Sequence, residues 1–106
     1  MSNQLPSEQY RLCAKDWVSK DGAARMLEDS KTAVLSQRMK ALGDMPVSSA
    51  EREVKSSPEW GNYIKQMVDA RTAANLAKVK MKYIEMKYFE GQSTNANRRA
   101  EMRLTA

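Results

Sequence analysis

The sequence predicts an all-α protein, an antiparallel helical hairpin of two long helices with short flanking helices. The first observation is a long series of apolar or amphipathic residues at three- and four-residue spacing in the second half of the chain, which is the pattern of one helix face. The second is composition. The chain of 106 residues has only 4 Gly and 3 Pro, too few for the turn every 8–12 or so positions that a β-sandwich needs.

The second long helix is expected at residues 58–90. Ser57 can cap its start, and Pro58 suits a first helical turn. At about 1.5 Å per residue the helix is roughly 50 Å long, and a helix of that length cannot bury an apolar face alone. The face is therefore predicted to be an interface. Its members are Trp60, Ile64, Met67, Ala70, Ala74, Ala77, Met81, Ile84 and Tyr88.

Residues 77–83 also alternate between apolar and basic side chains, which is a strand pattern. The alternation fails where Tyr83 and Ile84 adjoin, whereas the helical series continues through the segment. Ala, Lys and Met are also strong helix formers, so we expect helix here.

The first long helix is expected at about 8–42, with Ser7 as a possible cap and Gly43 as its C-terminal signal. Its apolar face is less regular. Gly22 is the weak point, because a mid-helix Gly costs about 1 kcal/mol relative to Ala. One long helix with a kink at Gly22 is favoured, and a new helix capped by Asp21 is the alternative.

A link at 43–49 should follow, and then a short helix at 50–56. The short helix is predicted from the sequence Ser48-Ser49-Ala50-Glu51, which has the S-x-x-E spacing of a capping box. The C-terminal basic segment, 91–106, begins with an apparent interruption at Gly91. Within it, residues 96–104 either form a last short helix or continue the long one. The whole chain is interpreted as one domain.

The residue inventory argues against an enzyme. There is no His and one Cys, so the commonest general base, zinc-finger patterns and Cys–His nucleophiles are excluded. Gly-rich phosphate loops and hydrolase motifs are absent too. The carboxylate pairs Glu28-Asp29 and Glu51-Glu53 have basic neighbours and fit a solvated helix surface. We expect no cofactor, no bound metal and no small-molecule substrate.

Two basic sets are candidate nucleic-acid contacts in a chain of net charge +5. The first set is interleaved with the aromatic residues Tyr83, Tyr88 and Phe89, so that rings could stack on bases while ammonium groups contact phosphates. Its lysines are Lys78, Lys80, Lys82 and Lys87. Lys78 and Lys82 share one helix face, and Lys80 and Lys87 share another. The alternative is that the rings pack between helices and the lysines are solvated. The second set is Arg98, Arg99 and Arg103, for which a solubilising tail is the alternative.

The apolar surplus predicts self-association. One helix–helix contact cannot easily cover Trp17, Leu76 and Phe89 as well as the main series, so a homodimer forming a four-helix arrangement is expected.

No segment reaches the ~18 uninterrupted apolar residues of a membrane span, and the first ten residues lack the pattern of a secretory signal. The single Cys13 fits a reducing compartment. These features predict a cytoplasmic protein without a membrane partner.

Three stretches carry a resemblance to a known family: AEREVKSSPEW (50–60), ARTAANLAKVKMKYIEMKYFE (70–90) and ANRRAEMRL (96–104). They resemble small helical proteins encoded by tailed phages and prophages. The resemblance covers most of residues 14–104 and is specific in the second half. It implies a gene beside early recombination genes, near single-strand-binding and annealing proteins, and it carries no catalytic residues. This chain differs from the family at Gly91, because its relatives have a polar, helix-forming residue at that position.

The resulting expectation is a non-enzymatic phage or prophage accessory protein, located in the host cell cytoplasm, that acts by binding in DNA replication or recombination. It would bind single-stranded DNA weakly and without sequence preference, or contact a DNA-bound recombination or replication protein. The alternative is a protein–protein adaptor or an inhibitor of a host nuclease or defence complex. An inhibitor that mimics DNA would be acidic, and the basic charge disfavours that form.

Overall fold

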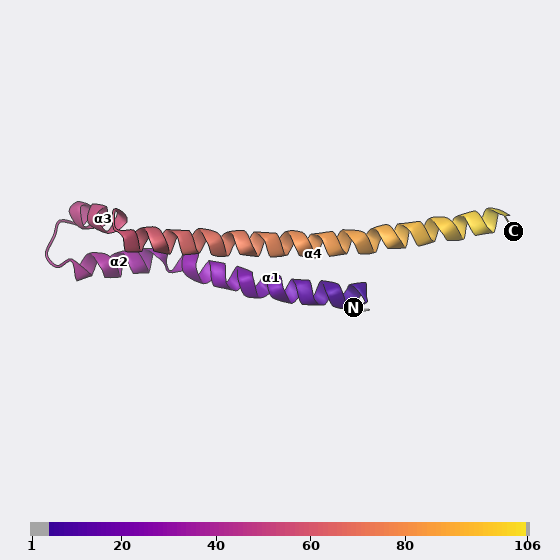
Figure 1. Cartoon of the computed structure of the whole chain (residues 1–106), viewed down its shortest axis with the longest axis horizontal. Coiled ribbons are helices and arrows are strands. Elements are labelled where there is room, and N and C mark those ends of the chain that lie inside the picture. The colour runs from indigo at the N-terminus through magenta and orange to yellow at the C-terminus, as the bar shows by residue number, and fades with distance from the viewer. Residues whose placement is uncertain (1–4, 106) are drawn as a thin grey trace.

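The computed structural model describes residues 5–105, and this part of the chain is helical throughout apart from short connections. Four helices follow one another: α1 (Pro6–Asp29), α2 (Lys31–Ala41), α3 (Val47–Lys55) and α4 (Pro58–Thr105). Figure 1 shows α1 running along one side of α4 in the opposite direction, while α2 continues past the start of α4 and lies beside α3, where the chain turns back. The predicted all-α class is confirmed.

The molecule is a rod, and at one end α4 continues without a second helix beside it in the described part of the chain. Its extents are 86 × 26 × 17 Å, and its radius of gyration is 23.9 Å, against about 13 Å for a compact domain of this length. Helix α4 has 48 residues and projects well beyond the start of α1 (Figure 1). We call residues 91–105 the arm. Every side chain from 91 to 104 is exposed.

The core is thin and lies where α1 and α4 meet and where α3 closes the hairpin. Small side chains form its tightest part: Ala24 of α1 and Ala74 of α4 are both fully buried, and Ala77 is 5% exposed. Alanines at these positions let the two backbones approach closely. The remaining buried apolar residues are Ala50, Val54, Trp60 and Met81.

The predicted apolar face of α4 lies largely against α1. Ile64, Met67, Ala70 and Ile84 are half-buried beside the fully buried members, while Tyr88 at the far end is 46% exposed. Covering the face within the hairpin leaves little of it for a second molecule. An additional interface must therefore use other residues.

The first long helix is divided, but not at Gly22, where a kink was predicted. Gly22 lies inside α1, and the interruption falls at Ser30. At this point the hydroxyl of Tyr63 donates a hydrogen bond to the carbonyl oxygen of Leu27, in the last turn of α1. A side chain that donates a hydrogen bond to a helix carbonyl competes with the backbone N–H groups of the helix for that acceptor. This competition explains why the helix is interrupted at this position.

The predicted ends of the short helix also need correction. α3 begins at Val47, directly after Pro46, and no side-chain cap is formed, so the expected capping box is absent. The backbone N–H of Ala50 donates to Pro46 O at 2.9 Å, which starts the helical bonding before Ser49. Likewise α1 begins at Pro6 without a cap from Ser7. In both places proline, whose fixed φ suits a helix start, sets the boundary.

Two predicted end signals behave as expected. Ser57 Oγ accepts a hydrogen bond from Trp60 N–H at 3.3 Å and donates one to Val54 O at 2.6 Å, so it caps α4 and ties it to α3. Gly43 follows α2 with φ +84°, and its N–H donates to Lys40 O at 3.1 Å. This is the left-handed C-terminal residue that glycine favours.

The apparent interruption at Gly91 does not end α4, which runs on to Thr105. Extending an existing helix requires no new nucleus, and one glycine costs only about 1 kcal/mol. The predicted end at residue 90 is therefore wrong, and residues 96–104 continue the long helix.

Candidate nucleic-acid interface

The four lysines of α4 lie on two flanks of the helix rather than in one patch. At about 100° per residue, Lys78 and Lys82 lie on one side of the face that contacts α1, and Lys80 and Lys87 lie on the other. All four are exposed. α1 runs between the two flanks, so a single strand could follow either pair but not both pairs at once over the hairpin.

Two lysines contact aromatic rings. The Lys78 ammonium lies 5.8 Å from the centre of the Trp17 ring in α1, and the Lys87 ammonium lies 5.5 Å from the Tyr83 ring. Both distances are within the range of cation–π attraction. Lys78 therefore has a partner within the hairpin, whereas Lys87 is held on the open surface of α4.

The rings near the lysines are largely outside the hairpin seam. Tyr83 is 58% exposed and Phe89 is 59% exposed. Tyr88 and Phe89 meet edge to face, with ring centres 5.8 Å apart. Tyr83 therefore lies outside the contact between the helices, whereas Tyr88 and Phe89 line a groove between α1 and α4. Stacking on a base remains open to them.

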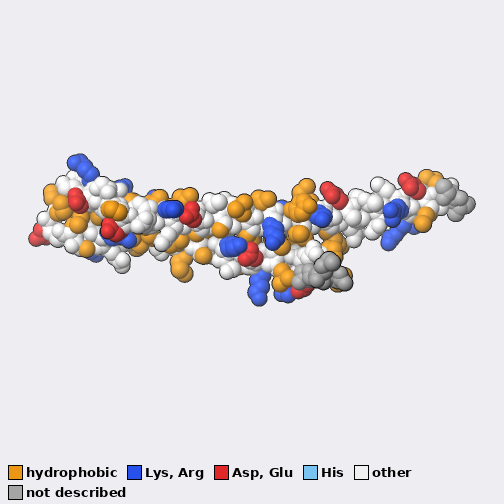
Figure 2. Space-filling view, in the orientation of Figure 1, with side chains coloured by type: hydrophobic (Ala, Val, Ile, Leu, Met, Phe, Trp, Pro, Cys, Tyr) orange, Lys and Arg blue, Asp and Glu red, His pale blue; other side chains and the backbone are white. Residues whose placement is uncertain are grey.

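Arg98, Arg99 and Arg103 belong to the arm, which extends beyond the start of α1. Figure 2 shows blue side chains gathered on this projecting end, with a red and an orange group near its tip. The arginines point from a helix that is open to solvent on every side in the described part of the chain. A polyanion can therefore approach them from any direction.

Sequence reasoning missed one feature, an ion-pair network that joins α1 to α4. The Arg71 guanidinium donates two hydrogen bonds to Glu28, at 2.9 and 2.6 Å, and one to Asp21 at 2.7 Å. Asp21 also pairs with Arg25 at 2.9 Å. Asp21 is 15% exposed, and Arg71 and Glu28 are about a third exposed. The seven-residue spacing of the two acids, on one face of α1, was the available signal.

The network shifts the pKa of each member in favour of its charged form. Hydrogen bonds from Arg71 are the main cause that lowers the pKa of both Asp21 and Glu28, against a smaller opposing effect of burial. Hydrogen bonds to Glu28 and then to Asp21 raise the pKa of Arg71. Each member of the network is therefore held in its charged form, and the matched charges link α1 to α4.

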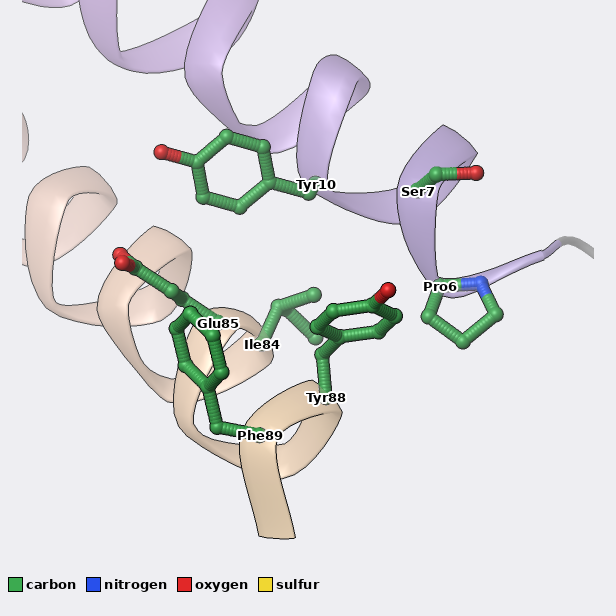
Figure 3. A pocket seen from close by; sticks show the side chains of 7 residues that line it. All are labelled: Pro6, Ser7, Tyr10, Ile84, Glu85, Tyr88 and Phe89. Atoms are coloured by element: carbon green, nitrogen blue, oxygen red, sulfur yellow. The ribbon is translucent and has the colours of Figure 1, made fainter. Parts of the chain in front are cut away.

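A groove of about 270 Å³ lies at the open end of the hairpin, between the start of α1 and α4. Figure 3 shows the Tyr10 and Tyr88 side chains on opposite sides of it, with Ile84 between them and Pro6 at its edge. Its walls are nearly all apolar, and Glu85 is its one charged residue. The groove lacks the set of convergent polar groups that a catalytic site needs.

The described residues contain no group of three or more acidic, Cys or His side chains placed to hold a metal ion. Among the same residues, no helix combines the length and the apolar character needed to cross a bilayer. Neither a protein-family model, nor a curated protein, nor a solved structure matches the chain. The geometry of α4 is therefore the basis on which a function can be inferred.

Proposed function

We propose that the protein is a non-enzymatic accessory protein, phage- or prophage-encoded, that binds single-stranded DNA weakly and without sequence preference during replication or recombination. Its contacts are the basic side chains in the second half of α4. We also propose that it acts as a dimer.

One observation carries the proposal. Arg98, Arg99 and Arg103 are presented on a helical arm that packs against no other helix of the hairpin. An exposed arm of this kind contributes nothing to the core, and its arginines suit phosphate contacts because the guanidinium is permanently charged and a good fork donor. At about 100° per residue, Lys80 and Lys87 lie on the same side of α4 as Arg98 and extend that surface toward the hairpin. The partly exposed Tyr88 ring is available for stacking.

Protein contact is the second candidate function, as an adaptor or an inhibitor of a host nuclease or defence complex. It is favoured by large apolar side chains on the face of α4 that points away from α1. These are Val68, Leu76, Val79, Tyr83 and Met86. These side chains are more than half exposed, which is unusual unless another protein covers them.

The test is a fluorescence-anisotropy titration of a labelled single-stranded oligonucleotide at several salt concentrations. Non-specific binding is mainly phosphate neutralisation, so log affinity should fall linearly with log salt, by roughly 0.7 per phosphate neutralised. If three or four side chains engage, the slope is about −2 to −3 by the same rule. Changing the oligonucleotide sequence should leave the affinity nearly unchanged.

Two matched variants locate the contact. Replacing Arg98, Arg99 and Arg103 by Gln should weaken binding and reduce the salt slope. The control replaces Lys31, Lys40 and Arg52 by Gln, three exposed basic residues near the closed end of the hairpin, and should bind like the wild type. Equal losses in both variants would mean that net charge alone causes binding. A folded wild-type protein that fails to bind at low salt would reject the proposal and leave protein contact.

A further inference from the structure

Helix α4 has a second apolar face, which the hairpin leaves uncovered. Its members are Val68 (52% exposed), Leu76 (65%), Val79 (66%), Tyr83 (58%) and Met86 (60%). At about 100° per residue they fall within a sector of roughly 80°, and that sector lies about opposite the buried Ala74, Ala77 and Met81. We call these five residues the outer stripe.

The outer stripe has the spacing of a coiled-coil seam. From Thr72 through Leu76, Val79 and Tyr83 to Met86 the steps are four, three, four and three residues. This alternation is the heptad pattern that packs one helix against another. The same pattern continues at both ends with charged residues, Lys65 and Asp69 before it and Glu90 after it. These charges restrict which helix can lie on the stripe and in which direction.

We propose that a second copy of the chain lies antiparallel on the outer stripe, with Leu76 of each copy opposite Val79 of the other. This inference deepens the proposed dimerisation and rests on it. In this register Thr72 lies opposite Tyr83, which places the largest ring against a small side chain. Leu76 and Val79 exchange places under the two-fold axis, so the centre of the contact is apolar on both copies, as a self-complementary contact requires.

The charges at the ends of the stripe complement one another in the same register. Lys65 of one copy lies opposite Glu90 of the other. Asp69 of one copy lies beside Lys87 of the other. Two-fold symmetry repeats each pair, so that both ends of the contact carry opposite charges face to face.

The lysines that flank the middle of the stripe also avoid one another. Lys80 of one copy lies next to Ala73 of the other, and Lys82 lies next to Asn75. No pair of like charges faces across the contact in this register. The lysine side chains remain at the edges of the dimer, where they can still reach a polyanion.

A parallel pair of α4 helices in register would place like charges, instead of opposite charges, across the contact. Lys82 of one copy would flank Lys87 of the other on both sides of the seam. Lys65, Asp69 and Glu90 would each face their own counterpart, and like charges across a seam are destabilising. The charge pattern of α4 therefore selects the antiparallel direction. α1 lies on the opposite face of α4, so it does not occupy the stripe.

The first test is the mass in solution, measured by light scattering over a micromolar concentration range without nucleic acid. The wild type should have twice the chain mass of 12.0 kDa, and Leu76→Asp should have the chain mass. Val18→Asp is the matched control, because Val18 is 62% exposed on α1 and outside the stripe. It should remain a dimer. Both sites are exposed in the single chain, so both variants should keep the helical circular-dichroism signal of the wild type.

The second test fixes the register by cross-linking, in a Cys13→Ser background. Asp69→Cys and Lys87→Cys are prepared as separate proteins and treated with a short bis-maleimide. A mixture of the two should cross-link, and each protein alone should not, because equivalent positions lie roughly 25 Å apart in the antiparallel pair. Cross-linking of each variant with itself would indicate a parallel pair and overturn the inference.

The outcomes separate this inference from the proposal on which it rests. A wild-type protein of chain mass throughout the range rejects both dimerisation and the stripe contact. A dimer that persists in Leu76→Asp keeps dimerisation but rejects the outer stripe. A wild-type monomer that binds a labelled acidic amphipathic helical peptide, with the binding lost in Leu76→Asp, would assign the stripe to a different protein and overturn the second copy as its occupant.

Discussion

Arg71 ties the two long helices together in a fixed register, as does the hydrogen bond from Tyr63 to Leu27. Its fork geometry allows two parallel hydrogen bonds to Glu28 and a third to Asp21. The alanines of the seam are too small and too similar to one another to fix the sliding position of α1 along α4. A directional contact at Arg71 supplies what the alanine seam lacks.

Removing this contact should destabilise the hairpin in a pH-dependent way. The pKa values of Asp21 and Glu28 are lowered in the folded protein. Their contribution to stability is therefore complete above the ordinary carboxyl pKa near 4 and is lost as the pH falls below it. Arg71→Gln should lower the urea midpoint at pH 7. Its deficit relative to the wild type should shrink below about pH 4, when both are measured at one protein concentration.

The control for this prediction is Arg11→Gln. Arg11 pairs with Glu8 one turn away on the same helix, and both side chains are largely exposed. Exposed pairs of this kind contribute little, so the urea midpoint should change much less than in Arg71→Gln. An Arg71→Gln deficit that persists unchanged at pH 2 to 3 would show that packing, and not the carboxylate contacts, is the cause.

At the scale of the helix, glycines with different backbone geometry should respond in opposite ways to alanine. Gly43 has φ +84°, and alanine in that conformation costs about 1–2 kcal/mol. Gly91 lies inside α4 with open space where a Cβ would be, so alanine should favour local helix by up to about 1 kcal/mol. Gly43→Ala should lower the thermal midpoint. Gly91→Ala should leave that midpoint nearly unchanged and slow amide hydrogen exchange in the arm.

Two results for the alanine variants would contradict this prediction, and each has a structural meaning. If Gly91→Ala raised the thermal midpoint as much as Gly43→Ala lowered it, the arm would unfold together with the hairpin. If Gly91→Ala had no effect on exchange in the arm, the arm would already be held in place by a contact outside the single hairpin.

Local patterns were sufficient to predict most of the fold. The apolar series from Trp60 to Met81 depends only on spacing within one helix, and the Ser57 and Gly43 end signals depend only on neighbouring residues. The break at Ser30 could not be predicted in this way. It coincides with a contact from Tyr63, 36 residues from its acceptor, Leu27. Sequence alone does not say which face of α1 meets which residue of α4.

The same limit applied to the candidate site. The basic residues and their division between two faces of the helix were visible from the spacing of the lysines. The spacing did not show on which side of α4 the helix α1 lies. The position of α1 is the reason that Lys78 contacts Trp17 while Tyr83 remains exposed. The Arg71 network was missed for the same reason, because its partners are 43 and 50 residues away.

At the scale of the whole molecule, packing is tight along the hairpin from Trp60 to Met81 and is lost in the arm at the tip of α4. The closed end has Trp60 and Val54 buried, the middle has the alanine seam, and residues 91–104 have only exposed side chains. Free energies of local opening follow packing, so the arm should open most easily. Its sequence reinforces this, because Gly, Ser, Thr and Asn are weaker helix formers than Ala or Lys.

A chain that ends after Glu90 should therefore keep the hairpin and lose the polyanion contact. The side chains of residues 91–104 are all exposed, so the urea midpoint should stay close to that of the full chain, and the helical signal should fall only by the contribution of the arm. Oligonucleotide affinity at low salt should fall, and the salt slope should shrink, because three arginines are removed. Collapse of the midpoint would show that the arm stabilises the hairpin, and unchanged affinity would place the phosphate contacts on the lysines of α4 instead.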